Sequence, residues 1–212
     1  VFTSCNTGVP TKEVAALYYN LGNAYYDLDN MDKAANAYVK AMEMDDSLES
    51  AGYNLVRLYL EIGNIEKAIA LLNDMLEDDP DNAVLINTLA YAYTLKEENE
   101  KALELYNEVL AQDEFNENAL YNSAILLWDI GDKNKARERF LDLYSMEAMA
   151  QDVLYNLGFL ELEMDNTEAG INFLTLYIEN DSEDIEARKA LGDAYMEQEL
   201  YGKAVEMYNT VL

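Results

Sequence analysis

Hydrophobic residues along this chain recur at helical spacing, and one short pattern recurs at a much longer spacing. Tyr121, Ile125 and Trp128 lie four and three residues apart, so they share one face of a helix. The triplet YNL occurs at residues 19–21, 53–55 and 155–157, and the related triplet YNS at 121–123. The tyrosines of these triplets are 34, 68 and 34 residues apart. The chain is therefore predicted to contain a 34-residue structural repeat.

Extending this period predicts six copies without an insertion. The copies start at Ala15, Glu49, Ala83, Glu117, Gln151 and Ile185, and the sixth stops after 28 residues. Each copy has a first amphipathic stretch of about fourteen positions, a polar turn such as LDN, IGN or IGD, and a second amphipathic stretch. This pattern is typical of two helices joined by a short turn.

Residue size also follows the period. The eighth position is small in five of six copies, with Val56 as the exception, and the twentieth is Ala in five copies and Gly170 in the fifth. Small residues there allow two helices to approach closely. The twenty-fourth position is always large: Tyr38, Leu72, Tyr106, Phe140, Leu174 and Tyr208. Since one helix pair cannot bury its apolar face alone, we expect the stack of pairs to be the folding unit.

The first copy, LYYNLGNAYYDLDNMDKAANAYVKAMEMDD, resembles a tetratricopeptide repeat, and the resemblance covers residues 15–212. It implies an all-α fold, an α-solenoid in which six stacked helix-turn-helix units form a right-handed superhelix. Residues 1–14 are expected to be a tether or a disordered segment. The fifth copy departs from the family pattern at Glu161 and Gly170, so we expect it to be the loosest joint, because glycine weakens a helix by about 1 kcal/mol relative to alanine.

The resemblance also implies a concave groove, lined mainly by positions two, five, nine and twelve of each copy, in which family members hold partners. The predicted partner-binding residues are Tyr91, Tyr121, Ile125, Trp128, Tyr155, Phe159 and Leu162. The predicted acidic rim consists of Asp129, Asp152, Glu161 and Glu163. Apolar patches rimmed with charge often mark partner sites, and Trp and Tyr are favoured anchors. The alternative is that these side chains pack on one another because the superhelix curls tightly.

Charge limits the classes of partner. The chain has 42 acidic and 14 basic residues, a formal net charge of -28, so nucleic acid and anionic lipid would be repelled and a cationic partner attracted. The family's carboxylate-clamping mode is disfavoured because position five is Tyr in four copies and Lys189 lies beside Asp193. We therefore expect the groove to bind a protein or peptide segment, extended or helical, with apolar anchors flanked by Lys or Arg. The alternative of charge serving solubility alone stays open.

Composition argues against an enzyme. The chain has no histidine and one cysteine, Cys5, which excludes the usual zinc sites and the usual serine and cysteine catalytic triads. Neither glycine-rich nucleotide-binding motif is present, and no apolar run is long enough to span a membrane. We expect no metal, no cofactor, no catalytic residue and no transmembrane segment.

Both ends of the chain leave alternatives open. Thr3 and Ser4 before Cys5 resemble the end of a bacterial lipoprotein signal, which would tether the protein to a membrane in the periplasm or outside the cell; an ordinary cytoplasmic N-terminus is the alternative. The last copy lacks a polar capping helix, which would leave apolar surface at Ala204, Val205, Tyr208 and Val211. Either the native chain continues, or this end pairs with another copy in a homo-oligomer. A small apolar ligand in the groove is a further alternative.

Overall fold

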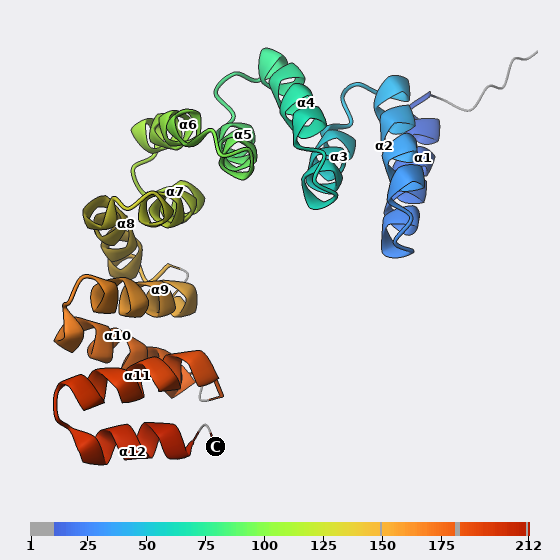
Figure 1. Ribbon diagram of the computed structural model, residues 1–212. Coiled ribbons are helices and arrows are strands. Elements are labelled where there is room, and N and C mark those ends of the chain that lie inside the picture. The colour runs from blue at the N-terminus through green and yellow to red at the C-terminus, as the bar shows by residue number, and fades with distance from the viewer. Residues whose placement is uncertain (1–10, 149, 181–182, 211) are drawn as a thin grey trace, which may run out of the picture. The chain divides into compact units, whose positions relative to one another are not determined.

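The computed structural model describes residues 11–148, 150–180, 183–210 and 212, and in them it contains twelve α-helices and no strand (Figure 1). The helices are α1 Thr11–Asp27, α2 Met31–Met44, α3 Glu49–Glu61, α4 Ile65–Asp78, α5 Ala83–Leu95, α6 Asn99–Gln112, α7 Glu117–Asp129, α8 Lys133–Ser145, α9 Ala150–Glu163, α10 Thr167–Asn180, α11 Ile185–Glu197 and α12 Tyr201–Asn209. The predicted all-α solenoid class is confirmed. None of the helices described is both long and apolar enough to cross a bilayer.

The helices follow the predicted period closely. Every second helix of a pair starts sixteen residues after a predicted repeat start, at residues 31, 65, 99, 133, 167 and 201. Among the first helices, α3, α5, α7 and α11 begin on the predicted repeat starts and α9 begins one residue earlier. Only α1 differs more, because it begins at Thr11, inside the segment expected to precede the repeats. Cys5 lies outside the described residues.

Each turn within a pair uses one left-handed residue at the fifteenth repeat position. These residues are Asp29, Gly63, Glu97, Gly131, Asp165 and Glu199, with φ between 57° and 88°. In each turn the next amide donates to a carbonyl five residues back, as Asn64 N does to Tyr59 O at 2.7 Å. This is the Schellman geometry that ends a helix and reverses the chain.

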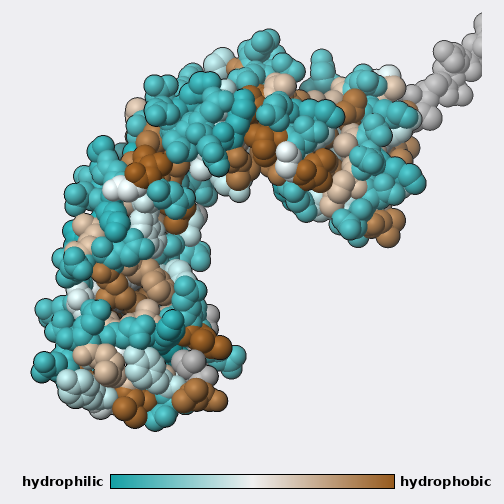
Figure 2. Space-filling view, in the orientation of Figure 1, coloured by the Kyte–Doolittle hydropathy of each residue, from teal (hydrophilic) through white to brown (hydrophobic). Residues whose placement is uncertain are grey.

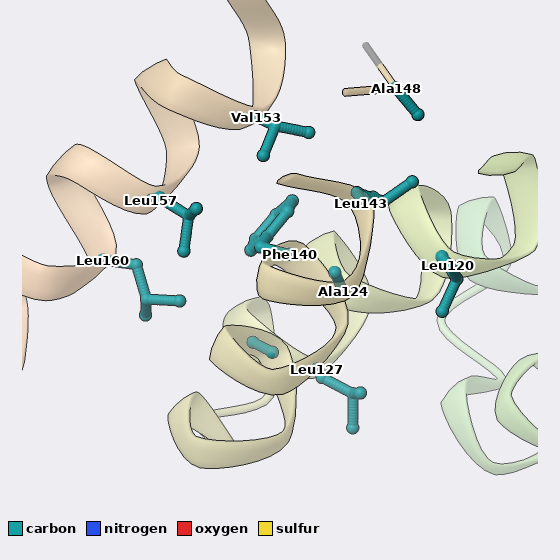
Figure 3. Close-up of a cluster of buried hydrophobic side chains, with 10 residues drawn as sticks. Leu120, Ala124, Leu127, Phe140, Leu143, Ala148, Val153, Leu157 and Leu160 are labelled. Carbon is teal, nitrogen blue, oxygen red and sulfur yellow. The ribbon is translucent and has the colours of Figure 1, made fainter. Parts of the chain in front are cut away.

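The chain divides into two compact units, Val1–Glu98 and Asn99–Leu212, called here the N-terminal and C-terminal units. The boundary in sequence falls between the two helices of the third repeat. In the N-terminal unit, Tyr38 packs with Ala34, Leu55 and Leu58. In the C-terminal unit, Phe140 of α8 lies between α7 and α9, close to the side chains of Ala124, Val153, Leu157 and Leu160 (Figure 3).

Small and large positions fit one another as the sequence predicted. A Cβ atom added to Gly22 would lie 2.5 Å from the Tyr38 ring, and one added to Gly192 would lie 2.5 Å from the Tyr208 ring. The eighth position is therefore small because the twenty-fourth side chain of the same repeat occupies its space. On the face shown in Figure 2, hydrophilic residues predominate and hydrophobic residues form separate groups.

Candidate partner-binding surface

The predicted partner-binding residues lie on the first helices of three repeats. Tyr91 lies on α5 of the N-terminal unit and is 43% exposed. The other six lie in the C-terminal unit and are half-buried: Tyr121, Ile125 and Trp128 on α7, and Tyr155, Phe159 and Leu162 on α9. We refer to these six residues as the α7–α9 face.

Trp128 is held by contacts on two sides. Its ring meets the buried Phe140 ring edge to face, with centroids 6.4 Å apart and planes at 89°. Its indole Nε1 donates a hydrogen bond to Oε2 of Glu163 at 2.9 Å, and Lys133 Nζ lies 3.1 Å from the same oxygen. The hydrogen bond from Trp128, with a further contribution from Lys133, lowers the pKa of the Glu163 carboxyl below its ordinary value. One rim carboxylate therefore fixes the orientation of the central aromatic residue.

The two tyrosines of this face also make specific contacts. Tyr121 meets Phe140 edge to face at 6.0 Å, and its hydroxyl accepts a hydrogen bond from Asn156 Nδ2 at 3.1 Å. Tyr155 contacts the rings of Phe159 and Tyr177, with centroids 4.6 and 5.2 Å away. Burial raises the pKa of both the Tyr121 and the Tyr155 hydroxyls. Both phenols are therefore neutral over the physiological pH range.

Hydrogen bonds with a 35-residue separation connect successive first helices. In the C-terminal unit they are Asn156 to Tyr121 and Trp128 to Glu163. In the N-terminal unit the same positions are joined, since Asn54 Nδ2 donates to Tyr19 and the Tyr26 hydroxyl donates to Glu61. These bonds were not predicted from the sequence. Their signal was the pairing of Tyr at position five with Asn at position six of the following repeat.

One alternative was that the groove side chains pack on one another, and the contacts show that they pack partly against the cores of the stack. Tyr121, Ile125 and Trp128 pack partly against the core around Phe140. Phe159 and Leu162 pack partly against the core around Leu174. The α7–α9 face therefore belongs partly to the stack, and the rest of each side chain is accessible to a partner.

The rim differs from the prediction at Glu161. Its side chain is completely buried, not exposed at an edge. Glu161 Oε1 accepts a hydrogen bond from Arg137 Nε at 2.6 Å, and Oε2 accepts one from Asn166 Nδ2 at 2.7 Å. A buried carboxylate requires such partners, because an unpaired charge is costly in the interior. Asp129, Asp152 and Glu163 are exposed.

The fifth repeat has a glycine at position 170, where the other repeats have alanine, because its packing leaves no space for a Cβ atom. A Cβ atom there would lie 2.6 Å from Leu162 Cδ2 and Cγ, and 3.0 Å from the carbonyl oxygen of Gly158. The Leu162 side chain thus occupies the space that the usual alanine would take. Gly170 and the ion pair of Glu161 are therefore both part of the packing of the fifth repeat.

Three lysines at the nineteenth repeat position stand over tyrosine rings. Lys67 Nζ lies 5.4 Å from the centroid of the Tyr59 ring, and Lys203 Nζ lies 5.1 Å from that of Tyr195. Lys33 stands over Tyr25 in the same way, at 5.3 Å. Each pair joins the two helices of one repeat through a cation–π contact. Over the described part of the chain, no group of three or more acidic or cysteine side chains is arranged to hold a metal ion.

Comparison with known proteins supports the repeat family. Residues 25–90 match the family model for the tetratricopeptide repeat. No curated protein matches the chain. A tetratricopeptide repeat protein from Parabacteroides merdae ATCC 43184 superposes with a TM-score of 0.74 at 18% identity, over 94% of this chain and 79% of that one.

Two further solved structures have the same fold at low identity. PilW, a widely conserved type IV pilus biogenesis factor, has a TM-score of 0.75 at 14% identity, over 92% of this chain and 90% of its own. A thermophilic TPR protein from Thermus thermophilus has a TM-score of 0.64 at 18% identity, over 86% and 99% of the two chains. Residues 25–90 thus match the tetratricopeptide-repeat family, and these structures share the fold of helix pairs found over the rest of the described chain.

Proposed function

We propose that this protein is an interaction scaffold whose α7–α9 face binds an extended or helical, apolar and cationic protein segment. The tetratricopeptide-repeat fold generally mediates protein–protein interaction and typically serves as a non-catalytic scaffold. The observation that carries the proposal is the row of accessible aromatic and aliphatic side chains on two successive first helices, held in register by the Trp128–Glu163 and Tyr121–Asn156 hydrogen bonds.

The energetics of this surface favour a few strong anchors. Trp and Tyr dominate binding hot spots because they bury a large area with few rotatable bonds. Here their rings are already oriented by Phe140, Glu163 and Asn156, so little rotamer entropy is lost when a partner binds. A partner would therefore be recognised by a preformed surface.

The exposed carboxylates beside the α7–α9 face indicate that the partner segment carries cationic residues. Asp129 and Asp152 are exposed next to the face, on α7 and α9 respectively. Lys or Arg residues beside the apolar anchors of a partner would meet these carboxylates while staying partly solvated. Such rim pairs mainly increase the association rate and the selectivity, and they weaken with salt.

The test is a peptide-display selection on the immobilised protein, followed by affinity measurements with the enriched peptides. We expect apolar residues flanked by Lys or Arg to be enriched. Replacing Trp128 with Ala should cost about 2 kcal/mol, roughly a 30-fold increase in Kd. The matched control is Phe115→Ala, since Phe115 is 55% exposed in the turn before α7 and lies off the face.

A charge variant keeps the test independent of folding. Asp129→Lys/Asp152→Lys changes only exposed side chains, and it should weaken binding by about tenfold and flatten its salt dependence. If Phe115→Ala weakens the enriched peptides as much as Trp128→Ala, or if the enriched peptides are acidic, the proposed surface is wrong.

A second candidate function, self-assembly, is favoured by the last helix. Leu200, Tyr201 and Val205 at α12 are 45%, 56% and 56% exposed. Ala204, which the sequence placed on the same open surface, is instead buried in the core with Leu191; Val211 lies outside the described residues. We expect Val205→Glu to abolish any concentration-dependent mass in light scattering. A wild-type monomer at all concentrations would dismiss this function.

A further inference from the structure

A hollow of about 510 Å³ lies within the N-terminal unit. The ends of α2 and α4 form two of its walls, through Met42 and Met75. The start of α3 contributes Gly52 and Tyr53, and the chain entering α5 contributes Asn82 and Leu85. Its volume falls within the range of sites that accept a small molecule or a large side chain.

Beside the hollow, the second repeat has a glycine where repeats three to five have a large apolar residue. Gly52 is the fourth residue of the second repeat, and the same position is filled by Ile86, Leu120 and Leu154 in repeats three to five. Those three side chains are buried, with 2%, 3% and 7% exposure. At Gly52 the ends of Met75 and Met42 fill the place of the missing side chain, and both methionines line the hollow.

Those methionines give the hollow an adaptable apolar floor. A Cβ atom on Gly52 would lie 3.1 Å from both Cε and Sδ of Met75, and 3.7 Å from Cε of Met42. Methionine is flexible and polarizable, and it is common at surfaces that accept varied apolar groups. A glycine inside a helix is destabilising relative to alanine. Gly52 therefore lowers the stability of α3 at the residue where that helix lines the hollow.

The rim of the hollow carries one sign of charge. Five carboxylates line it, all exposed, and no Lys or Arg is among its lining residues: Asp46, Glu49, Asp74, Asp78 and Asp79. Asn82 lies among them with a fixed side chain, since its Nδ2 donates to Asp79 Oδ2 at 2.8 Å while its Oδ1 caps α5. An apolar floor below a ring of carboxylates is complementary to a side chain that is apolar at its centre and flanked by cations.

We infer that this hollow, called here the Gly52 pocket, binds one apolar side chain of a protein segment whose neighbouring residues are Lys or Arg. The apolar side chain packs against Met42 and Met75, which line the hollow. The cationic neighbours meet the rim carboxylates, which would otherwise repel one another across the opening. This site does not depend on the α7–α9 face and adds a second point of contact in the other unit.

The probe for this inference is the pentapeptide Lys-Lys-Phe-Lys-Lys, titrated into the full chain with ¹³C-labelled methionine methyl groups. Nine methionines give nine methyl signals, assigned by single Met→Leu variants. We expect saturable shifts at Met42 and Met75. The peptide Lys-Lys-Ala-Lys-Lys should bind at least tenfold more weakly, because it keeps the charges and lacks the anchor.

Gly52→Leu is the decisive variant. Its Cβ would lie 3.1 Å from Met75, so the added side chain should push the methionine ends into the hollow and lower peptide binding at least tenfold. The matched control is Gly202→Leu on α12, where an added Cβ meets nothing within 4 Å. Asp74→Asn/Asp78→Asn should weaken the same peptide without changing the apolar floor.

Several results would overturn the inference. They are unchanged binding by Gly52→Leu, shifts at other methionines in place of Met42 and Met75, and equal binding of the alanine peptide. Equal binding of butylammonium ion and the peptide would assign the pocket to a small organic cation. Trp128→Ala should leave the Met42 and Met75 shifts unchanged, so a failure here is distinguishable from a failure of the α7–α9 face.

Discussion

At the scale of single residues, the Glu161–Arg137 pair shows how two departures from the repeat pattern depend on each other. Position eleven is Tyr or Leu in the other five copies, and position twenty-one is Arg only at Arg137. Glu161 is fully buried, whereas the Arg137 side chain is 40% exposed. Removing either partner therefore has a different consequence, because only the carboxylate lacks access to water.

We expect Arg137→Leu to lower the free energy of unfolding by about 2–3 kcal/mol, since it leaves a buried carboxylate held by Asn166 alone. Glu161→Leu should cost less, because the guanidinium reaches solvent. The double variant should recover most of the loss, as an apolar pair of similar volume replaces the ions. Urea unfolding followed by circular dichroism measures all three. Additive losses in the double variant would show that the two residues are not coupled.

At the scale of elements, the turn between paired helices depends on backbone conformation more than on side chains. Gly63 has φ of +72°, and an added Cβ would meet nothing within 4 Å. Asp29, Glu97, Asp165 and Glu199 adopt the same left-handed conformation at the equivalent position. The turn therefore forms with or without glycine, at a cost in the copies that lack it.

Glycine-to-alanine substitutions at two open positions should have opposite signs. Gly63→Ala should reduce stability by about 1 kcal/mol, because the left-handed conformation disfavours a Cβ. Gly202→Ala, in helical conformation on α12 and equally free of neighbours, should raise stability by about 0.5 kcal/mol. Urea unfolding of both variants checks this. A loss of stability in both would mean that packing, not backbone conformation, decides the effect at these glycines.

At the scale of the whole molecule, the 34-residue period was sufficient to predict the fold class and nearly every helix start. The period alone does this because each repeat places the same small and large residues in contact, as Gly22 and Tyr38 are. It misplaced Glu161, because the partner that allows its burial lies 24 residues earlier and outside any local pattern. The Gly52 pocket was not predicted, although Gly52 is the one small residue at a position where the other repeats have Tyr18, Ile86, Leu120, Leu154 and Arg188.

The helix positions of the proposed surface residues could be predicted from the sequence, whereas their packing could not. Spacing placed Tyr121, Ile125 and Trp128 together on α7. The ring of Phe140 and the carboxylate of Glu163 that hold Trp128 come from other helices, so no local pattern indicates them. The burial of each side chain of the face therefore depends on residues of neighbouring helices, and it could not be predicted from the sequence.

The central claim is that a partner segment binds along the α7–α9 face, and the most direct measurement is the emission of Trp128 during titration with a display-selected peptide. Trp128 is the only tryptophan of the chain, so its emission reports this face alone. We predict a saturable blue shift with the same Kd as binding, absent with a scrambled acidic peptide. Emission that is unchanged while the peptide binds would contradict the claim and place the binding site elsewhere.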